Sequence, residues 1–176
     1  GIGIRSALKR VPEPQGSCTV MITPDRERTM ATHLGAAITF REDFLDREAL
    51  KKTSVLHVEG YQLDSPNQTR AASQAMEVVK ENGGRVSMDC SDSWLIKRHR
   101  DQLESFIDTY VDILFANETE AEELTGKKPE EAVEEIASRV EVAVVTLGEG
   151  GSLIRSGEEM HRIPALETEV INLNGA

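Results

Sequence analysis

From residue 54 onward, segments that favour strands alternate with segments that favour helices. The β-favouring runs are residues 54–59, 85–89, 112–116 and 142–147. Strands that alternate with helices build a parallel sheet, because each crossover helix carries the chain back to the edge where the previous strand began. The sequence therefore predicts an α/β fold with a doubly wound, mainly parallel sheet and helices on both of its faces. The β-branched run at 142–147 is typical of a strand buried on both faces.

The helix predicted after the first of these strands has the clearest end signals. Ser65 can cap it, Pro66 occupies its first position, and Gln68 stands three residues after the cap. Asn82 and the two glycines that follow it end the helix. Further helices are predicted at residues 95–107, 118–125 and 129–138, and further strands at 152–155 and 160–163.

A β-hairpin is predicted ahead of this pattern. Residues 17–22 alternate along the strand, residues 28–33 form a second β-favouring run, and turn residues separate the two. No internal repeat or linker is visible in the sequence. We therefore expect residues 1–176 to be part of a single domain, with residues 17–37 as an edge or lid hairpin.

Charge and composition disfavour several classes of function. A net charge of −11 argues against binding to nucleic acid or to an anionic membrane through the overall field. No apolar run approaches the roughly 18 residues that a membrane span needs. Cys18 and Cys90 lie far apart, without Cys or His at metal-ligand spacing, so we expect neither a disulfide nor a zinc site. A cytoplasmic protein without nucleic-acid or membrane partners fits these features.

Asn117 and Glu120 follow the strand predicted at 112–116. In open α/β sheets, ligands bind beyond the carboxyl ends of the strands, so we expect both side chains at that edge. An amide and a carboxylate three residues apart on the first turn of a helix face the same way. They can hold a hydrated Mg²⁺ through water molecules. The alternative is structural: Asn117 caps the helix and Glu120 completes a capping box.

A glycine-rich segment follows the strand predicted at 142–147. Glycines at Gly148 and Gly151 let the backbone approach a ligand closely, and Thr146 supplies a hydroxyl. A strand rather than a helix comes next, so this is not the phosphate loop of a dinucleotide-binding fold. The alternative is a structural hairpin turn.

The last residues form a third polar turn at a predicted strand end. Val170 and Ile171 are apolar, and the small residues Asn174, Gly175 and Ala176 can turn their backbone N–H groups towards an anion. A plain polar turn is the alternative.

Taken together and in this order, the three segments resemble the ribokinase-like (PfkB) family of carbohydrate and nucleoside kinases. The segment Asn117-Glu118-Thr119-Glu120 matches the family's Asn-x-x-Glu motif, which is associated with Mg²⁺ and phosphate. Residues 145–151 are similar to its nucleotide-contacting strand and loop, and residues 172–176 to the start of its Asp-Thr-x-Gly-Ala-Gly-Asp signature. The hairpin that leads to Gly35 and Ala36 is most similar to the bacterial adenosine-kinase-like branch.

This resemblance implies an ATP-dependent kinase that transfers the γ-phosphate to a primary hydroxyl of a sugar or nucleoside, with ATP and Mg²⁺ as cofactors. The residues that it assigns to nucleotide binding are Asn117, Thr146, Gly148, Gly151 and Asn174. It further assigns Glu120 to Mg²⁺ and both Gly175 and Ala176 to the catalytic anion hole.

The hairpin also receives roles from this resemblance. Arg28 would bring a positive charge over the transferring phosphate, as an arginine does in the adenosine-kinase branch. The alternative is a solvated hairpin charge. Family hairpins of this kind often pair between subunits, so a homodimer through this hairpin is a further hypothesis.

Two departures from the family pattern qualify the resemblance. Asn172 and Leu173 stand where the family usually has Asp and Thr. The signature's final Gly-Asp, whose Asp is the family's general base, and the family's Gly-Gly-Asn sugar-binding segment are both absent from the sequence. We therefore expect the central part of a longer kinase, inactive by itself. The alternative is a catalytically silent nucleotide-binding or regulatory module of the same fold.

Overall fold

The chain divides into two compact units. One comprises residues 41–166, and the other comprises residues 1–40 together with 167–176. The computed structural model describes residues 9–24 and 28–167 of the chain. The larger unit contains the strand–helix alternation, and the smaller one contains the predicted hairpin.

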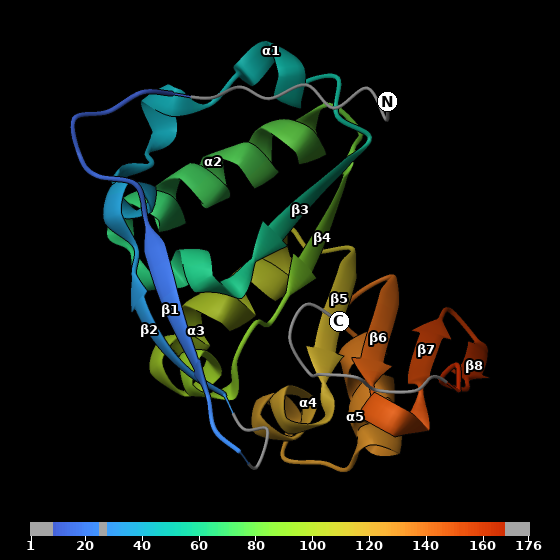
Figure 1. Cartoon of the computed structure of the whole chain (residues 1–176). Coiled ribbons are helices and arrows are strands. Elements are labelled where there is room, and N and C mark those ends of the chain that lie inside the picture. The colour runs from blue at the N-terminus through green and yellow to red at the C-terminus, as the bar shows by residue number, and fades with distance from the viewer. Residues whose placement is uncertain (1–8, 25–27, 168–176) are drawn as a thin grey trace. The chain divides into compact units, whose positions relative to one another are not determined.

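The larger unit is built on a six-stranded sheet (Figure 1). Its strands are β3 (Val55–Glu59), β4 (Arg85–Asp89), β5 (Ile113–Asn117), β6 (Val142–Thr146), β7 (Ser152–Ser156) and β8 (Glu159–Ile163). They lie side by side in chain order. Strands β3 to β6 are parallel, whereas β7 and β8 each run antiparallel to the strand before them. The predicted mainly parallel α/β sheet is confirmed.

Helices connect the parallel strands, as predicted. The connecting helices are α2 (Pro66–Glu81), α3 (Ser93–Thr109), α4 (Glu118–Thr125) and α5 (Pro129–Ala137). The 3-10 segment η2 (Glu42–Phe44) and the short helix α1 (Arg47–Leu50) precede β3. Segment η3 (Gly60–Asp64) follows β3, and η4 (Gly148–Gly150) lies between β6 and β7. Helix α2 begins at Pro66 as predicted, but the side chain of Ser65 forms no cap hydrogen bond. Helix α3 begins before residue 95 because Asp92 accepts a hydrogen bond from the N–H of Trp94 at 3.1 Å. Within the described part of the chain, no helix has the length and apolar character to span a membrane.

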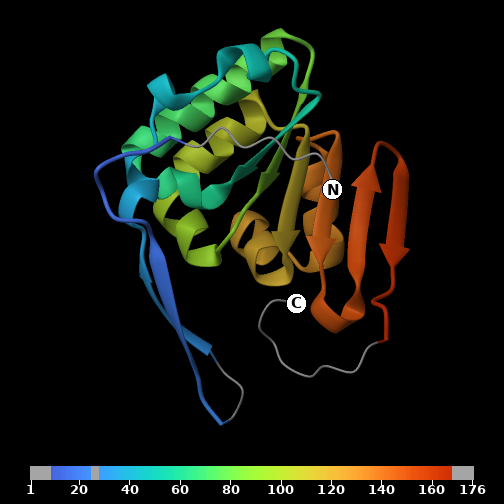
Figure 2. The same cartoon turned by 45° about the horizontal axis from the view of Figure 1, so that its top comes forward.

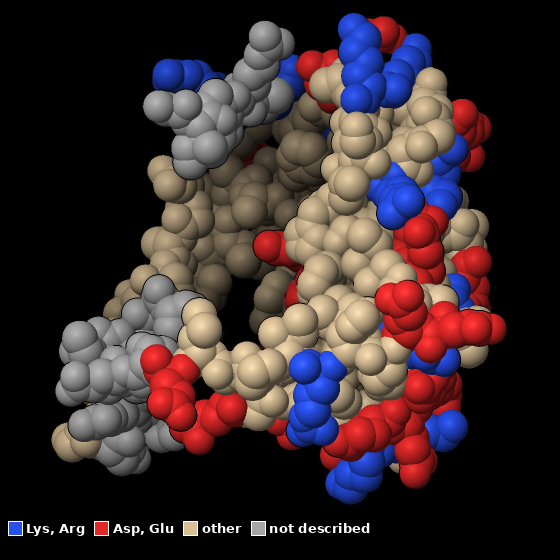
Figure 3. Space-filling model, turned by 90° about the vertical axis from the view of Figure 1, so that its right-hand side faces the viewer, with Lys and Arg blue, Asp and Glu red and all other residues tan. Residues whose placement is uncertain are grey.

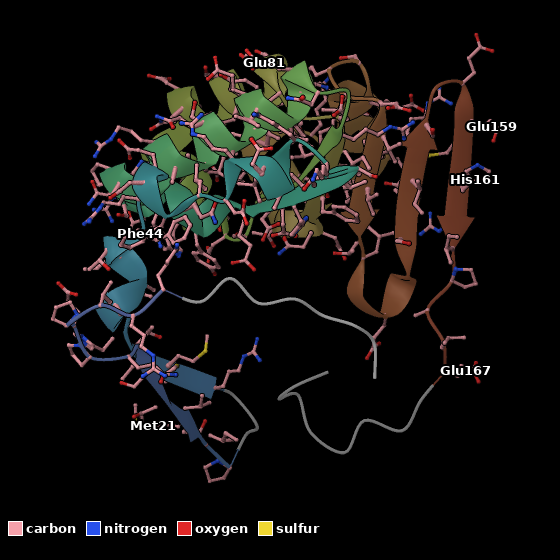
Figure 4. All side chains as sticks on the ribbon, turned by 90° about the horizontal axis from the view of Figure 1, so that it is seen from above. Met21, Phe44, Glu81, Glu159, His161 and Glu167 are labelled. Carbon is pink, nitrogen blue, oxygen red and sulfur yellow. The ribbon has the colours of Figure 1, made fainter. Side chains whose placement is uncertain are left out.

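The four longer helices lie on one face of the sheet (Figures 2 and 4). Because the strand order never reverses in residues 41–166, right-handed crossovers bring every connecting helix to the same side. Within residues 41–166, the connecting helices therefore form one layer. Burial alternates accordingly: Ala143 and Val145 are 0% exposed, whereas Val142 and Val144 are half-buried. The β-branched run of β6 is thus fully buried on the helix side only.

The core lies between the sheet and these helices. Met76, Val86, Met88, Leu103 and Leu114 are among its fully buried side chains. At the start of β5, one carboxylate joins three elements. Asp112 accepts the backbone N–H of Val86 at 2.7 Å and forms an ion pair with Lys80 of α2.

Ion pairs connect the outer strands β7 and β8 to α5. Arg155 lies 3.0 Å from Glu134, and Arg162 lies 3.3 Å from Glu130. Both arginines point from the sheet towards the helix layer. Figure 3 shows basic and acidic side chains close together on this side of the molecule. At this edge, charged side chains take over part of the packing that apolar side chains provide nearer the centre.

The smaller unit contains the predicted hairpin. Strands β1 (Ser17–Ile22) and β2 (Arg28–His33) pair antiparallel, and all of their residues are exposed. The segment η1 (Gly35–Thr39) follows. Gly35 has a φ of 53°, and a Cβ there would lie 2.4 Å from the carbonyl oxygen of Pro14, so this turn requires glycine. The hairpin is confirmed, while its role as an edge or lid and a homodimer through it stay predictions.

We expect the two cysteines to differ sharply in their reactivity. Cys18 is exposed in β1, whereas Cys90 is 0% exposed. Burial raises the pKa of the Cys90 thiol, and the carboxylates of Glu120 and Asp89 raise it further. Because the thiolate is the reacting form, an alkylating reagent should modify Cys18 quickly and Cys90 only after unfolding. Peptide mapping by mass spectrometry after timed labelling of the whole protein measures both rates, and equal rates would contradict the buried position of Cys90.

Candidate active site

The carboxyl ends of β5 and β6 bring two of the predicted motifs together. Asn117 is the last residue of β5 and Thr146 the last residue of β6, and the two are direct partners in the parallel register. Both side chains are exposed at this edge. Helix α4 leaves from Asn117, and the glycine-rich turn leaves from Thr146 (Figure 1). The Asn117 amide, the Thr146 hydroxyl, the start of α4 and the glycine-rich turn therefore share one edge of the sheet, as predicted.

Asn117 and Glu120 form a complete capping box. One carboxylate oxygen of Glu120 accepts the backbone N–H of Asn117 at 2.9 Å, and the other accepts the Asn117 side-chain amide at 2.7 Å. The side-chain oxygen of Asn117 in turn accepts the backbone N–H of Glu120 at 2.9 Å. The structural alternative for this motif is thus present. Its role towards Mg²⁺ stays a prediction, and the two roles are compatible.

Glu120 is a buried carboxylate in acidic surroundings. Its residue is only 4% exposed. Burial raises the pKa of its carboxyl, the backbone N–H of Asn117 lowers it, and the nearby Asp89 and Asp92 raise it again. A divalent cation near this group would offset the accumulated negative charge.

The donor set suits a hydrated cation better than a directly ligated one. Among the described residues, no three His, Cys, Asp or Glu side chains converge on a point where they could ligate a metal ion. Magnesium keeps several of its water molecules and needs few protein ligands. The Asn117 amide and the Glu120 carboxylate therefore fit Mg²⁺ held through water.

The glycine-rich turn between β6 and β7 is a closed structural turn. The N–H of Leu147 donates to the carbonyl of Gly151 at 2.8 Å, and the N–H of Gly150 donates to that of Leu147 at 2.9 Å. Gly148 and Gly151, the two glycines predicted to contact a ligand, differ in the space around them. Gly148 has a φ of 53°, and nothing lies within 4 Å of a Cβ placed there, so a ligand can approach its backbone. At Gly151, a Cβ would lie 1.9 Å from the carbonyl oxygen of Ile163, so packing requires this glycine.

The remaining predicted residues lie elsewhere in the chain. Arg28 is exposed at the start of β2 in the smaller unit, and its catalytic role stays a prediction. Asn174, Gly175 and Ala176 lie outside the described residues, as do Asn172 and Leu173.

Two residues that the sequence did not single out lie next to this site. Burial raises the pKa of Tyr61, and the carboxylates of Asp92 and Glu120 raise it further. Asp92 also raises the pKa of Glu120. Tyr61 follows β3 and Asp92 follows β4. Ligands bind beyond the carboxyl ends of parallel strands. Both residues would have been found if this rule had been applied to every parallel strand.

The turns after β3 and β4 are in close contact. A Cβ at Gly60 would lie 2.5 Å from the carbonyl oxygen of Cys90. Ser91 has a φ of 72°, which is unusual for a residue other than glycine, and its N–H donates to a carboxylate oxygen of Asp89 at 2.7 Å. These contacts hold Asp89 and Asp92 in a fixed turn beside Glu120.

Comparison with known proteins decides the family. The sequence matches the pfkB family of carbohydrate kinases over residues 1–176. The chain belongs to this family. Adenosine kinase from Sinorhizobium meliloti is 31% identical with a TM-score of 0.83, and a probable sugar kinase from Rhizobium etli is 31% identical with a TM-score of 0.84. In both comparisons the match covers 90% of this chain and 49% of the other.

A third structure shares the fold at lower identity. A putative ribokinase II from E. coli in complex with ATP and Mg²⁺ is 23% identical with a TM-score of 0.76, over 86% of this chain and 51% of its own. The chain thus spans about half the length of these pfkB and kinase structures.

We expect the capping box to contribute more to stability than an ordinary helix cap. In the whole protein, Asn117→Ala should lower the free energy of unfolding by about 2–3 kcal/mol, because it removes the cap and one donor to a buried carboxylate. Asp46→Ala is the matched control, since Asp46 caps α1 at 3.0 Å with an exposed side chain, and we expect a loss of about 1 kcal/mol. Denaturant unfolding measures both, and equal losses would contradict the contribution of Glu120.

Proposed function

We propose that this chain is part of an ATP-dependent kinase that transfers the γ-phosphate to a primary hydroxyl of a nucleoside or sugar. One observation carries the proposal. In a member of the pfkB family, the register of β5 and β6 pairs Asn117 with Thr146, so the amide–carboxylate pair and the glycine-rich turn share one edge of the sheet. Because the chain spans about half of the matched structures, this activity is that of the whole protein.

Phosphoryl transfer needs positioning and charge neutralisation more than covalent chemistry. The exposed Thr146 hydroxyl and the open backbone of Gly148 would contact the nucleotide. Asn117 and Glu120 would hold Mg²⁺ through water, and the cation would neutralise the phosphate charge. The roles of Arg28 over the transferring phosphate and of residues 174–176 around an anion belong to the same proposal. Gly151 supports the turn through its packing against Ile163.

The similarity to an adenosine kinase and to a probable sugar kinase, both at 31% identity, supports a nucleoside or a sugar as the acceptor. The direct test incubates the whole protein with Mg·ATP and a panel of nucleosides and sugars. We expect ADP release that depends on one class of acceptor and that stops when EDTA removes the metal. Binding of ATP without turnover on any acceptor would favour the silent nucleotide-binding module.

Glu120→Gln separates the structural role of Glu120 from a role in holding Mg²⁺. The side-chain oxygen of the introduced Gln can still accept a hydrogen bond from the Asn117 backbone N–H, but its NH₂ group cannot accept one from the Asn117 side-chain amide. We therefore expect the free energy of unfolding to fall by about 1 kcal/mol. Removing the charge should raise the half-saturating Mg²⁺ concentration by about 10-fold or more, with partial recovery of turnover in excess Mg²⁺.

The control for this variant is Glu122→Gln. Glu122 lies on the same helix, and its exposed side chain pairs with Lys128 at 3.1 Å. We expect it to leave the Mg²⁺ titration unchanged. Turnover measured across a Mg²⁺ titration compares the two variants. If Glu120→Gln and the wild type gave the same titration curve, Glu120 would cap α4 without holding Mg²⁺.

A further inference from the structure

Helix α3 carries a kink, and the three consecutive side chains there reach two different neighbours. His99 has a non-helical backbone, with φ −123° and ψ 27°. The ring of His99 lies 3.1 Å from Asp64 at the end of η3, and Arg98 lies 3.4 Å from the same carboxylate. The side chain that follows His99 reaches a different helix. That side chain is Arg100, and it contacts α4.

Arg100 closes the C-terminal end of α4. Its guanidinium donates to the carbonyl of Glu123 at 2.6 Å and to the carbonyl of Leu124 at 3.1 Å. The last carbonyls of a helix have no partner within the helix, and a cation there also interacts favourably with the helix dipole. Of the neighbouring carbonyls, that of Glu122 accepts the N–H of Gly126 at 2.7 Å. Arg100 thus supplies, from another helix, the hydrogen bonds that the end of α4 lacks.

Helix α4 is short, so its two ends are mechanically close. It comprises eight residues, and its first turn holds Glu120. Ala121 and Leu124, which are 0% and 7% exposed, anchor one side of it in the core. The capping box fixes the N-terminal end and Arg100 the C-terminal end. Rotation or fraying of so short a helix at one end would move the carboxylate at the other.

We propose that Arg100 is a positioning residue for the site: through the C-terminal carbonyls of α4 it holds Glu120 in the orientation that Mg·nucleotide needs. The magnesium part of this inference rests on the proposed function. Arg98 and His99 connect the kink of α3 to Asp64 of η3. Arg100 connects α3 to the end of α4, and it also pairs with the carboxylates of Glu104 at 3.2 Å and Glu123 at 3.3 Å. Removing the guanidinium of Arg100 should therefore change the position of the Glu120 carboxylate, whereas removing that of Arg98 should not.

Two measurements on the whole protein test this inference with matched variants. Arg100→Met keeps a long side chain but removes the donors, and Arg98→Met makes the same change two residues away. In Arg100→Met, we expect the backbone amide of Glu120 to exchange its hydrogen about 10-fold faster, because the helix that carries it has lost charge-assisted hydrogen bonds. We also expect the half-saturating Mg²⁺ concentration for turnover to rise about 10-fold. Arg98→Met should leave both values at the wild-type level.

The conservative variant Arg100→Lys keeps the charge but not the planar fork that reaches two carbonyls. In Arg100→Lys, we expect the exchange rate of the Glu120 amide and the half-saturating Mg²⁺ concentration to lie between those of the wild type and Arg100→Met. If Arg100→Met does not fold, Arg100→Lys is the variant that tests the proposal. Wild-type values for Arg100→Lys would overturn the proposal. If Arg100→Met lowers the melting temperature but leaves hydrogen exchange at Glu120 at the wild-type rate, Arg100 stabilises the fold without positioning Glu120, and the proposal is overturned. If the wild type phosphorylates no acceptor, the proposed function fails, and the exchange arm alone still decides the positioning role.

Discussion

The parallel pairing of β5 with β6 is the constraint on which the candidate site depends. Backbone hydrogen bonds fix the register of the two strands, and the register places Asn117 beside Thr146. Each strand ends at this point, so Asn117 begins helix α4 and Thr146 begins the glycine-rich turn. A shift of the register by one residue would turn the facing side chains to opposite sides of the sheet. The buried Leu114, Ala116, Ala143 and Val145 prevent such a shift, because it would expose them.

Much of this fold follows from local signals in the sequence. Pro66 and the Asn-Gly-Gly that ends α2 mark that helix correctly, and the β-branched and alternating runs mark the strands. Local signals do not say which face of the sheet a given helix covers. A β-branched run such as Val142 to Thr146 looks the same whether its second face is fully buried or half-buried, since β-branched residues suit both environments. Only the strand order, which depends on long-range pairing, shows that α2 to α5 share one side.

The candidate site shows the same division between local and long-range information. Asn117 and Glu120 were predictable because the capping box and the family motif lie within four consecutive residues. Tyr61 and Asp92 belong to no such motif, and their connection to Glu120 arises only when three strand ends meet. Arg100 is further removed still. The contacts that connect it to the end of α4 include the carbonyls of Glu123 and Leu124, and a backbone acceptor leaves no side-chain signature in the sequence.

The close contact at Gly151 changes how this turn should be interpreted in related sequences. A glycine in a segment that contacts nucleotides suggests a backbone that must touch the ligand, yet here the nearest obstacle is the carbonyl oxygen of Ile163 at the end of β8. Any larger residue at Gly151 would first push the β8 end away from the β6–β7 turn. Impaired nucleotide binding after such a substitution would then originate in a displaced sheet edge. Gly148 has open space around it, but its φ of 53° favours glycine, so a side chain there would strain the turn itself and leave β8 in place.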